Sequence, residues 1–246
     1  RYTACKDPAI RALPVGVIDP QLRMLSFEGE AGPLAVVTFY ATHPQSYYRT
    51  GGANPDFPGM ARNQRQQQTG VFHLHFNGAG GNIGAGKFND GGHENRQVLA
   101  DKVAAAMQAA WQSRQTTPLT AGQVAWSQAV AELPVAEHLQ EDELSGLVAD
   151  DATPFALRCH SAEKLAFLRR ANAERHVPIA ISRLQLAGNQ LLFLPGELFV
   201  EYQLAAQAMK PETQVMLAAY GDYGTGYIGT RVAYPQGGYE VSPGAT

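Results

Sequence analysis

A strand pattern that runs directly into a glycine-rich loop is the feature that most constrains this chain. Residues 71–92 read VFHLHFNGAGGNIGAGKFNDGG, in which apolar and polar residues first alternate and glycines then recur. Alternation with a period of two predicts a β-strand over 71–76. Glycine permits backbone conformations and close approaches that other residues do not, and such loops commonly carry functional groups. The pattern therefore predicts a strand that ends beside a ligand.

Two nucleotide-binding motifs are only partly matched by this loop. The segment 81–87 satisfies G-x-x-x-x-G-K, but Phe88 stands where a phosphate-binding loop has Ser or Thr, and Asn89 begins a turn instead of a helix. A dinucleotide fingerprint that starts at Gly78 would need a third glycine at the position of Ile83. Nucleotide binding is therefore disfavoured, and a loop of glycines needed for tight backbone packing is the simpler interpretation.

Composition excludes several classes of protein. Of the 246 residues, 45% are hydrophobic, which is enough for a full core. The formal net charge of -3 gives no general attraction to nucleic acid or to an anionic membrane surface. The longest apolar stretches, such as 33–41, are strand-sized and far shorter than a membrane span. We therefore expect a soluble globular protein with no nucleic-acid partner and no transmembrane segment.

The cysteines and the start of the chain carry less information. Cys5 and Cys159 are too few for a thiolate zinc cluster and leave either one long-range disulfide or two buried thiols. Arg1 is neither an initiator nor part of a charged lead into an apolar segment, which suggests a mature or truncated chain. Neither feature indicates the oligomeric state.

Strand and helix patterns interleave along the chain. Periodicity, residue type and turn signals together predict strands over 34–40, 71–76, 123–133, 179–187, 190–194 and 215–219, and helices over 58–68, 94–113, 138–149, 161–175 and 199–209. Gly188-Asn189 is a two-residue hairpin signal, and the irregular stretch 138–175 is a candidate insertion or lid. These patterns predict an α/β fold of mixed α+β type, with a mixed β-sheet core flanked by helices in a single domain.

Polar groups follow three of the predicted strands. They are His43 in THP, Glu197 in PGE, and the Gly/Tyr segment around Tyr227. Ligands in sheet-based folds collect at strand ends, so a shared site is physically reasonable. Taken singly, each group also has a structural explanation: a hydrogen-bonded histidine, a carboxylate favoured at a helix N-terminus, and a packed tyrosine.

The order and spacing of five segments are more specific. The segments are THPQS, PDFPGMAR, GAGGNIGAG, LPGELFVEY and GTGYIGTRVAYPQGGYE. Together they resemble the neutral/alkaline non-lysosomal ceramidase family and its bacterial relatives, from about Gly16 to the C-terminus, with 123–175 the least diagnostic region. The resemblance implies a zinc-dependent hydrolase in lipid metabolism, secreted or periplasmic, that cleaves an amide (N-acyl) or related bond of a small-molecule or lipid-like substrate.

The resemblance also implies roles for individual residues. His43 corresponds to a zinc-binding histidine, Glu197 to the zinc-binding glutamate of the PGE motif, and Tyr227 to a tyrosine at the metal. Tyr239 corresponds to a second tyrosine, which contacts substrate. These residue types suit the chemistry, because imidazole and carboxylate are good Zn²⁺ ligands and an open position is needed to activate water.

Two departures from the family pattern bear on this interpretation. The family has another zinc histidine in a His-Thr-His-Ser-Gly motif well before the THP segment, and this chain contains no such motif. The sequence is then either the C-terminal part of a longer catalytic domain or one with an incomplete metal site. The family's Gly-Asp-Val-Ser-Pro segment corresponds to 81–85, which places Gly84 at the position of a serine tied to catalysis. Glycine offers no nucleophile.

If the chain is hydrolytic, attack by metal-activated water is therefore expected. The loop residues Gly80, Gly81 and Asn82 would line the substrate site, where the backbone amides of the loop stabilise a developing oxyanion. A general base is required near the metal, and Asp56 and Asp222 are candidates, although each is also a typical turn residue.

Other polar residues near the loop have two interpretations each. His73 and His75 project from one face of the predicted strand, either as a metal pair or as packed, hydrogen-bonded side chains, and the resemblance assigns no ligand there. Lys87 and His93 could bind an anionic substrate group or face solvent.

Two alternatives to a zinc-dependent amide hydrolase remain open. One is a ligand-binding or scaffolding homologue that has lost the chemistry, which Gly84 and the missing upstream histidine motivate. The other is an ester or lactone hydrolase on the same metal site, since fold similarity does not determine substrate.

Overall fold

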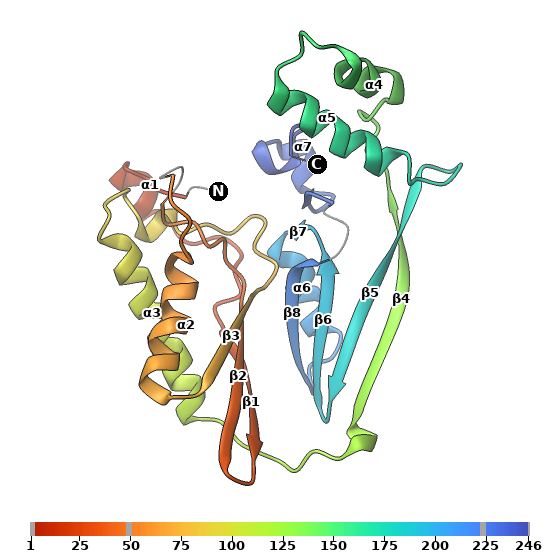
Figure 1. Ribbon diagram of the computed structural model, residues 1–246. Coiled ribbons are helices and arrows are strands. Elements are labelled where there is room, and N and C mark those ends of the chain that lie inside the picture. Colours follow the sequence, from red (N-terminus) through yellow and green to blue (C-terminus); the bar gives the residue numbers. More distant parts are fainter. Residues whose placement is uncertain (1–2, 48–50, 222–224, 246) are drawn as a thin grey trace.

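Two mixed β-sheets pack face to face at the centre of the structure, and α2 and α3 pack against the outer side of the first (Figure 1). The structure is a computed structural model that describes residues 3–47, 51–221 and 225–245. Strands and helices interleave within a single domain, which confirms the predicted α/β fold of mixed α+β type. The sequence predicts one mixed sheet, whereas the described strands divide into two mixed sheets and a short parallel pair.

Each sheet combines parallel and antiparallel neighbours. The first contains β1 (Arg23–Gly29), β2 (Gly32–Tyr40) and β3 (Phe72–Asn77) in that order, with β1 antiparallel and β3 parallel to β2. The second contains β4 (Val124–Pro134), β5 (His176–Leu186), β6 (Asn189–Pro195) and β8 (Gln214–Gly221), of which only β8 joins its neighbour in parallel. A short parallel pair joins β7 (Glu197–Leu198) to β9 (Tyr227–Ile228).

The interface between the two sheets is apolar and alternates along the strands. Val37 and Phe39 of β2 pack with Leu191 of β6 and with Met216 and Ala218 of β8. Residues two apart on a strand share a face, so this spacing places one whole side of β2 against the second sheet. The run 34–40 is therefore an interior strand, as its β-branched and aromatic residues predict.

The longer helices surround the sheets. They are α2 (Asp56–Thr69), α3 (Asn95–Gln112), α4 (Glu141–Ala149), α5 (Phe155–Leu168) and α6 (Val200–Ala208), and the short helices α1 (Pro8–Ala12) and α7 (Ala233–Gln236) lie near the two ends of the chain. α2 and α3 lie on the outer side of the first sheet, whereas α4 and α5 connect β4 to β5 and lie at one end of this antiparallel pair (Figure 1).

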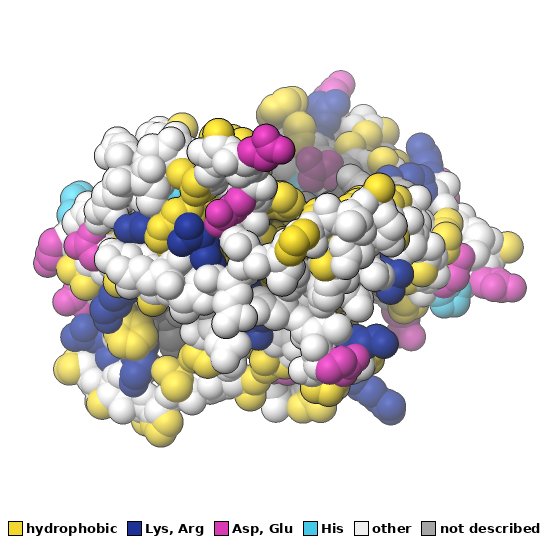
Figure 2. Space-filling view, turned by 90° about the horizontal axis from the view of Figure 1, so that it is seen from below, with side chains coloured by type: hydrophobic (Ala, Val, Ile, Leu, Met, Phe, Trp, Pro, Cys, Tyr) yellow, Lys and Arg dark blue, Asp and Glu magenta, His cyan; other side chains and the backbone are white. Residues whose placement is uncertain are grey.

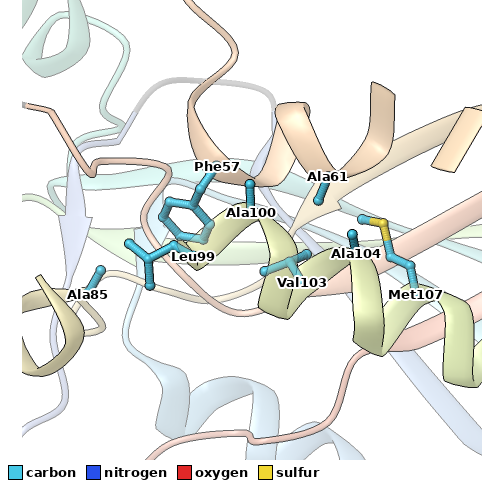
Figure 3. Close-up of a cluster of buried hydrophobic side chains, with 8 residues drawn as sticks. All are labelled: Phe57, Ala61, Ala85, Leu99, Ala100, Val103, Ala104 and Met107. Atoms are coloured by element: carbon cyan, nitrogen blue, oxygen red, sulfur yellow. The ribbon is translucent and has the colours of Figure 1, made fainter. Parts of the chain in front are cut away.

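Small residues allow α2 and α3 to pack closely. Ala61 of α2 faces Ala100 and Ala104 of α3, with Phe57 and Met107 filling the space at the two ends of the contact (Figure 3). Short side chains at the contact reduce the distance between helix axes. α2 precedes β3 and the glycine loop in the chain and α3 follows them, so the contact between the two helices joins the two sides of this segment.

Some boundaries differ from the sequence prediction. The helix predicted over 161–175 lies at Phe155–Leu168, because it begins directly after Pro154, a residue that favours helix starts. The β5–β6 turn is Ala187-Gly188, one position before the predicted pair, and Ala187 takes a φ of 51°. Strand β1 has no counterpart in the prediction.

Both cysteines are free thiols. Cys5 is buried, whereas Cys159 is exposed on α5. Both alternatives offered by the sequence, a disulfide and two buried thiols, are therefore wrong.

The described surface carries mixed charge. On the face shown in Figure 2, basic, acidic and hydrophobic side chains of the described residues are interspersed. Within the described ranges, no helix has the length and apolar character needed to cross a membrane.

His73 and His75 lie on the side of β3 that faces α2. His73 Nε2 lies 3.2 Å from Thr69 Oγ1, and His75 Nδ1 lies 2.9 Å from Thr38 Oγ1. Burial lowers the pKa of both imidazoles, and burial with the charge of Arg62 lowers the pKa of His75 to about 4. These contacts match the interpretation that the two histidines are packed and hydrogen-bonded. The positive charge of the neighbouring Arg62 disfavours a metal ion at this pair.

The low pKa of His75 predicts a loss of stability in mild acid. An unfolded histidine has a pKa of about 6.5, so the unfolded chain takes up the proton first as the pH falls. The contribution of neutral His75 to the free energy of unfolding is complete above pH 6.5 and is lost between pH 6.5 and about 4, by up to about 3 kcal/mol. Urea unfolding of the wild type and of His75→Gln at pH 7 and pH 4.5 measures this difference.

The variant His75→Gln should show a smaller decrease between these two pH values than the wild type. His160→Gln, which alters an exposed histidine on α5, is the matched control and should leave the decrease unchanged. Equal decreases in the wild type and His75→Gln would exclude His75 as the source.

Candidate active site

Loops after three strands bring distant residues together. His43 follows the end of β2, Glu197 opens β7 directly after β6, and Tyr227 opens β9. Glu197 and Tyr227 are register partners in the parallel β7–β9 pair. Gly196 has a φ of 64°, and a Cβ there would lie 2.6 Å from Gly226 O, so the PGE motif needs its glycine to present the glutamate.

His43, Glu197 and Tyr227 converge on one point. His43 Nε2 lies 2.9 Å from Glu197 Oε2 and 3.2 Å from the phenol oxygen of Tyr227. The rings of His43 and Tyr227 are nearly parallel, with centroids 6.1 Å apart. The side chain of His43 is 6% exposed and that of Glu197 is 29% exposed, so the point of convergence is reached from one side.

The other ring nitrogen of His43 determines what Nε2 offers. Nδ1 lies 2.6 Å from Gly80 O and 3.2 Å from Ile83 O, and a carbonyl oxygen can only accept, so Nδ1 carries the hydrogen. A neutral His43 therefore presents an unprotonated Nε2. This nitrogen and an ionised Glu197 carboxylate are both acceptors, so their 2.9 Å separation requires a proton or a cation between them.

The donor atoms fit zinc in type. Imidazole nitrogen and carboxylate oxygen are common zinc ligands, and a carbonyl that accepts from the far ring nitrogen is the usual way in which a ligating histidine is oriented. Over the described ranges, no group of three or more His, Cys, Asp and Glu residues could hold a metal. The third polar atom at this point is the Tyr227 phenol oxygen, whereas catalytic zinc usually has three His, Cys or carboxylate ligands.

Two further tyrosines border this centre. The ring of Tyr239 lies 5.9 Å from that of Tyr227 at 77°, and the residue is 63% exposed. The ring of Tyr220 meets His43 edge-on at 6.3 Å. Tyr220 has a φ of 60°, a conformation that is uncommon for tyrosine and is often found at functional sites, and its amide donates to Gly196 O at 3.0 Å. Its place at a strand end is the one sequence signal for Tyr220.

The glycine loop is wedged between the His43 loop and β7. A Cβ on Gly80 would lie 2.9 Å from the carbonyl carbon of Thr42. A Cβ on Gly81 would lie 2.8 Å from Leu198 O and still closer to Glu197 O. The Gly81 amide donates to Leu198 O at 2.8 Å. Close backbone packing is thus one reason for these glycines.

Hydrogen bonds within the protein use several groups of this loop. The amides of Gly81 and Ile83 donate to backbone carbonyls, so the oxyanion role predicted for the loop does not extend to these two. The side chain of Asn82 accepts from the Val200 amide and donates to Glu201 Oε2, both at 2.9 Å. Asn82 therefore caps the first turn of α6.

Gly84 and Lys87 both border one cavity of about 230 Å³. This cavity is also lined by Ile83 and by the apolar segment 13–18. Lys87 Nζ donates to the carbonyl oxygens of Arg11 and Leu13, which ties the end of α1 to the loop. The ammonium group thus has two structural partners in the described chain.

Of the two candidate bases, only Asp56 lies within the described residues. Asp56 is buried and accepts from the amide and hydroxyl of Ser46 and from the Phe57 amide, which orders the loop after His43. None of its hydrogen bonds within the described ranges reaches His43. Asp222 lies outside the described residues. His93, a candidate for anion binding, packs against the ring of Tyr47, with centroids 4.5 Å apart.

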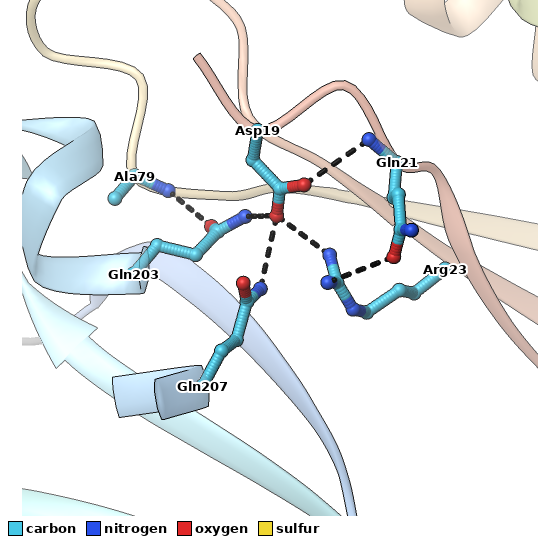
Figure 4. A network of polar contacts seen from close by, with 6 residues as sticks. All are labelled: Asp19, Gln21, Arg23, Ala79, Gln203 and Gln207. Atoms are coloured by element: carbon cyan, nitrogen blue, oxygen red, sulfur yellow. Dashed lines mark hydrogen bonds and ion pairs between the residues drawn. The ribbon is translucent and has the colours of Figure 1, made fainter. Parts of the chain in front are cut away.

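A buried polar network behind the glycine loop was not apparent from the sequence. Asp19 accepts from Gln203 Nε2 at 2.6 Å, from Gln207 Nε2 at 2.9 Å and from Arg23 Nη1 at 2.6 Å (Figure 4). Gln203 Oε1 in turn accepts from the Ala79 amide at 3.0 Å. The network connects the entry to β1, the start of the loop and α6. Burial alone would raise the pKa of Asp19, but these hydrogen bonds and the charge of Arg23 outweigh it and lower the pKa.

Replacing Asp19 by asparagine should destabilise the protein. The change leaves Arg23 without its carboxylate and adds an amide group among donors, which costs about 2–3 kcal/mol in the free energy of unfolding. The lowered pKa means that the charged form stabilises the fold at pH 7 and that this contribution decreases as the pH falls below about 4. Urea unfolding at pH 7 measures the loss. Glu30→Gln, on an exposed turn, is the control, and a loss no larger than the control's would contradict a structural role for the network.

Comparison with known proteins identifies the fold. No protein-family model matches the sequence, and no curated protein matches it either. The structure of neutral ceramidase from Pseudomonas aeruginosa superposes with a TM-score of 0.62 and 18% identity, over 95% of this chain and 45% of that one. A ceramidase complexed with C2 gives a TM-score of 0.60 and 14% identity, over 95% and 46%. This chain therefore has a ceramidase-like fold and spans less than half the length of either protein.

Proposed function

We propose that this chain is a zinc-dependent hydrolase that cleaves an amide (N-acyl) or related bond. The observation that carries the proposal is the convergence of His43 Nε2, Glu197 Oε2 and the Tyr227 phenol oxygen, with His43 Nδ1 held by the Gly80 carbonyl. The ceramidase-like fold supports a hydrolase of this kind. This chain spans less than half the length of each of these two proteins, so any activity of the whole protein is also only proposed for it.

Each residue has a role in this proposal. His43, Glu197 and Tyr227 would hold a zinc ion, which when bound would supply Lewis acidity toward an acyl carbonyl and toward water. The Gly80 carbonyl keeps His43 in the tautomer with a free Nε2. Tyr239, exposed beside Tyr227, contacts the substrate.

Water is the nucleophile in this scheme, because Gly84 has no side chain that could attack. Asp56 is held by Ser46 and Phe57, so Asp222 is retained as the proposed general base. Gly80, Gly81 and Asn82 form the wall of the site through their backbone. A lipid-like substrate and a secreted or periplasmic location follow from the family resemblance and are part of the same proposal.

A ligand-binding or scaffolding role is the second candidate. It is favoured by Gly84 and by the lack of a third His, Cys, Asp or Glu beside His43 and Glu197 in the described ranges. Ester or lactone hydrolysis on the same centre is the third candidate, since the three donors do not select among acyl bonds.

A substrate screen separates these candidates. The purified chain is assayed against N-acyl amines, esters and lactones, with added Zn²⁺ and after chelation. The proposal predicts hydrolysis of at least one N-acyl amine with zinc and loss of that activity on chelation. Hydrolysis of esters or lactones alone would support the third candidate. No hydrolysis of any compound would support the second.

A further inference from the structure

One peptide group of the glycine loop connects the two sides of the candidate centre. Its carbonyl oxygen, on Gly80, accepts from His43 Nδ1 at 2.6 Å. Its amide, on Gly81, donates at 2.8 Å to the carbonyl oxygen of Leu198, the residue after Glu197 on β7. The C=O and N–H of a planar trans peptide point in opposite directions, so this rigid group, the bridging peptide, spans from His43 to the strand of Glu197.

Helix α6 holds the loop on both sides of the bridging peptide. Before it, the Ala79 amide donates to Gln203 Oε1 at 3.0 Å. After it, Asn82 Oδ1 accepts from the Val200 amide at 2.9 Å. Gln203 and Val200 both belong to α6, which follows β7 in the chain. The helix that begins just after Glu197 therefore fixes the loop at two points.

The side chain of Gln203 has one orientation in this structure. It is 4% exposed, and its Nε2 donates to Asp19 Oδ2 at 2.6 Å (Figure 4). A carboxylate can only accept, so the amide nitrogen faces Asp19 and the amide oxygen faces Ala79. A Cβ on Gly78 would collide with this oxygen, which shows how closely Gln203 lies against the loop backbone. Both ends of the side-chain amide are thus engaged.

We propose that Gln203 is a positioning residue for the centre formed by His43 and Glu197. By accepting from the Ala79 amide, it keeps the bridging peptide aimed so that the Gly80 carbonyl accepts from His43 Nδ1. This inference rests on the proposed zinc site and adds α6 to the elements that prepare it. Replacing a group that orients a metal-binding histidine typically weakens metal binding by about 10–100-fold. Gln203 acts one step further away, so a smaller effect is expected.

Gln203→Met and Gln207→Met form a matched pair of variants. Both remove an amide that donates to Asp19, and within the described ranges only the Gln203 side chain also has a hydrogen bond to the loop. The NMR signal of the proton on His43 Nδ1, identified by its loss in His43→Gln, reports the hydrogen bond to Gly80 in the metal-free chain. We expect this proton to exchange with water about tenfold faster in Gln203→Met and at the wild-type rate in Gln207→Met.

Zinc titration of the same variants gives the second readout. The Kd should increase about three- to tenfold in Gln203→Met and by less than about twofold in Gln207→Met. Urea unfolding of both variants separates this effect from a general loss of stability, since both lose a hydrogen bond to Asp19.

A further variant covers the case in which Gln203→Met does not fold. Gly78→Ala leaves Gln203 in the chain, but the added Cβ would displace its amide oxygen from the Ala79 amide, so the same two changes are expected. Exchange or zinc affinity equal to that of Gln207→Met would overturn the inference. A wild type that binds no zinc, with exchange that still depends on Gln203, would contradict the proposed function alone. Zinc binding that is independent of Gln203 would contradict the inference alone.

Discussion

Replacing Glu197 by glutamine is expected to lower kcat/KM for an N-acyl amide by about a thousandfold. The change keeps the size of the side chain but removes the carboxylate from the three converging donors, and a neutral amide oxygen binds zinc weakly. Loss of metal-based stabilisation of the transition state amounts to several kcal/mol, which corresponds to this factor. Steady-state kinetics with saturating Zn²⁺ measures the effect.

The matched control is Glu212→Gln, which removes one exposed carboxylate from a loop before β8. It should leave kcat/KM within about twofold of the wild type, because long-range charge effects are screened in buffer. If Glu197→Gln kept more than a tenth of the wild-type activity while the control behaved normally, the carboxylate would have no place at the reacting centre.

The variant Gly81→Ala is expected to lose stability and activity together. A Cβ at this position would meet the backbone oxygens of Glu197 and Leu198, neither of which can move without displacing β7. Overpacking against backbone typically costs about 1–3 kcal/mol, and here the displaced atoms belong to a proposed zinc ligand. Urea unfolding and the amide hydrolysis assay give the two values.

Gly122→Ala provides the comparison, because a Cβ there would meet nothing within 4 Å and its φ is not positive. We expect its free energy of unfolding to change by less than about 0.5 kcal/mol. If Gly81→Ala were as stable and as active as Gly122→Ala, the tight packing of the glycine loop against β7 would not be needed for the site.

Elements with strong local periodicity could be predicted from the sequence. The strand 34–40 and the helix 94–113 match β2 and α3 closely, because the first is rich in β-branched and aromatic residues and the second repeats its apolar residues at the helical period. Strand β1 cannot be predicted in this way, since it depends on antiparallel pairing with β2 across a tight turn and has no clear alternation of its own. The bounds of helix α5 differ from the predicted ones because its apolar positions are spread around the helix, so Pro154 is the better boundary signal.

The candidate site, like the fold, can be predicted from the sequence only in part. His43 and Glu197 could be proposed as neighbours because both follow strand ends, although 154 residues separate them. The partners of Asp19 could not be proposed from the sequence, because Gln203 lies 184 residues away and neither residue belongs to a recognisable motif. Local sequence identifies groups that emerge from strands, whereas a network of buried hydrogen bonds depends on which elements pack together.

Lys87 shows how a motif can match by letter and differ in role. The phosphate-binding pattern G-x-x-x-x-G-K ends at this lysine, but the side chain binds the carbonyl oxygens of Arg11 and Leu13. The missing Ser or Thr at Phe88 was the sequence signal against phosphate. The structural partner of the lysine could be found only from the fold.

Zinc binding by His43 and Glu197 is the central claim, and equilibrium titration of the metal-free chain with Zn²⁺ tests it most directly. We predict about one zinc ion per chain in the wild type and in His160→Ala, whose histidine is exposed on α5. The Kd should increase at least about a hundredfold in His43→Ala and in Glu197→Gln. The claim would be contradicted if the wild type bound no zinc, or if His43→Ala bound it with the same Kd as His160→Ala.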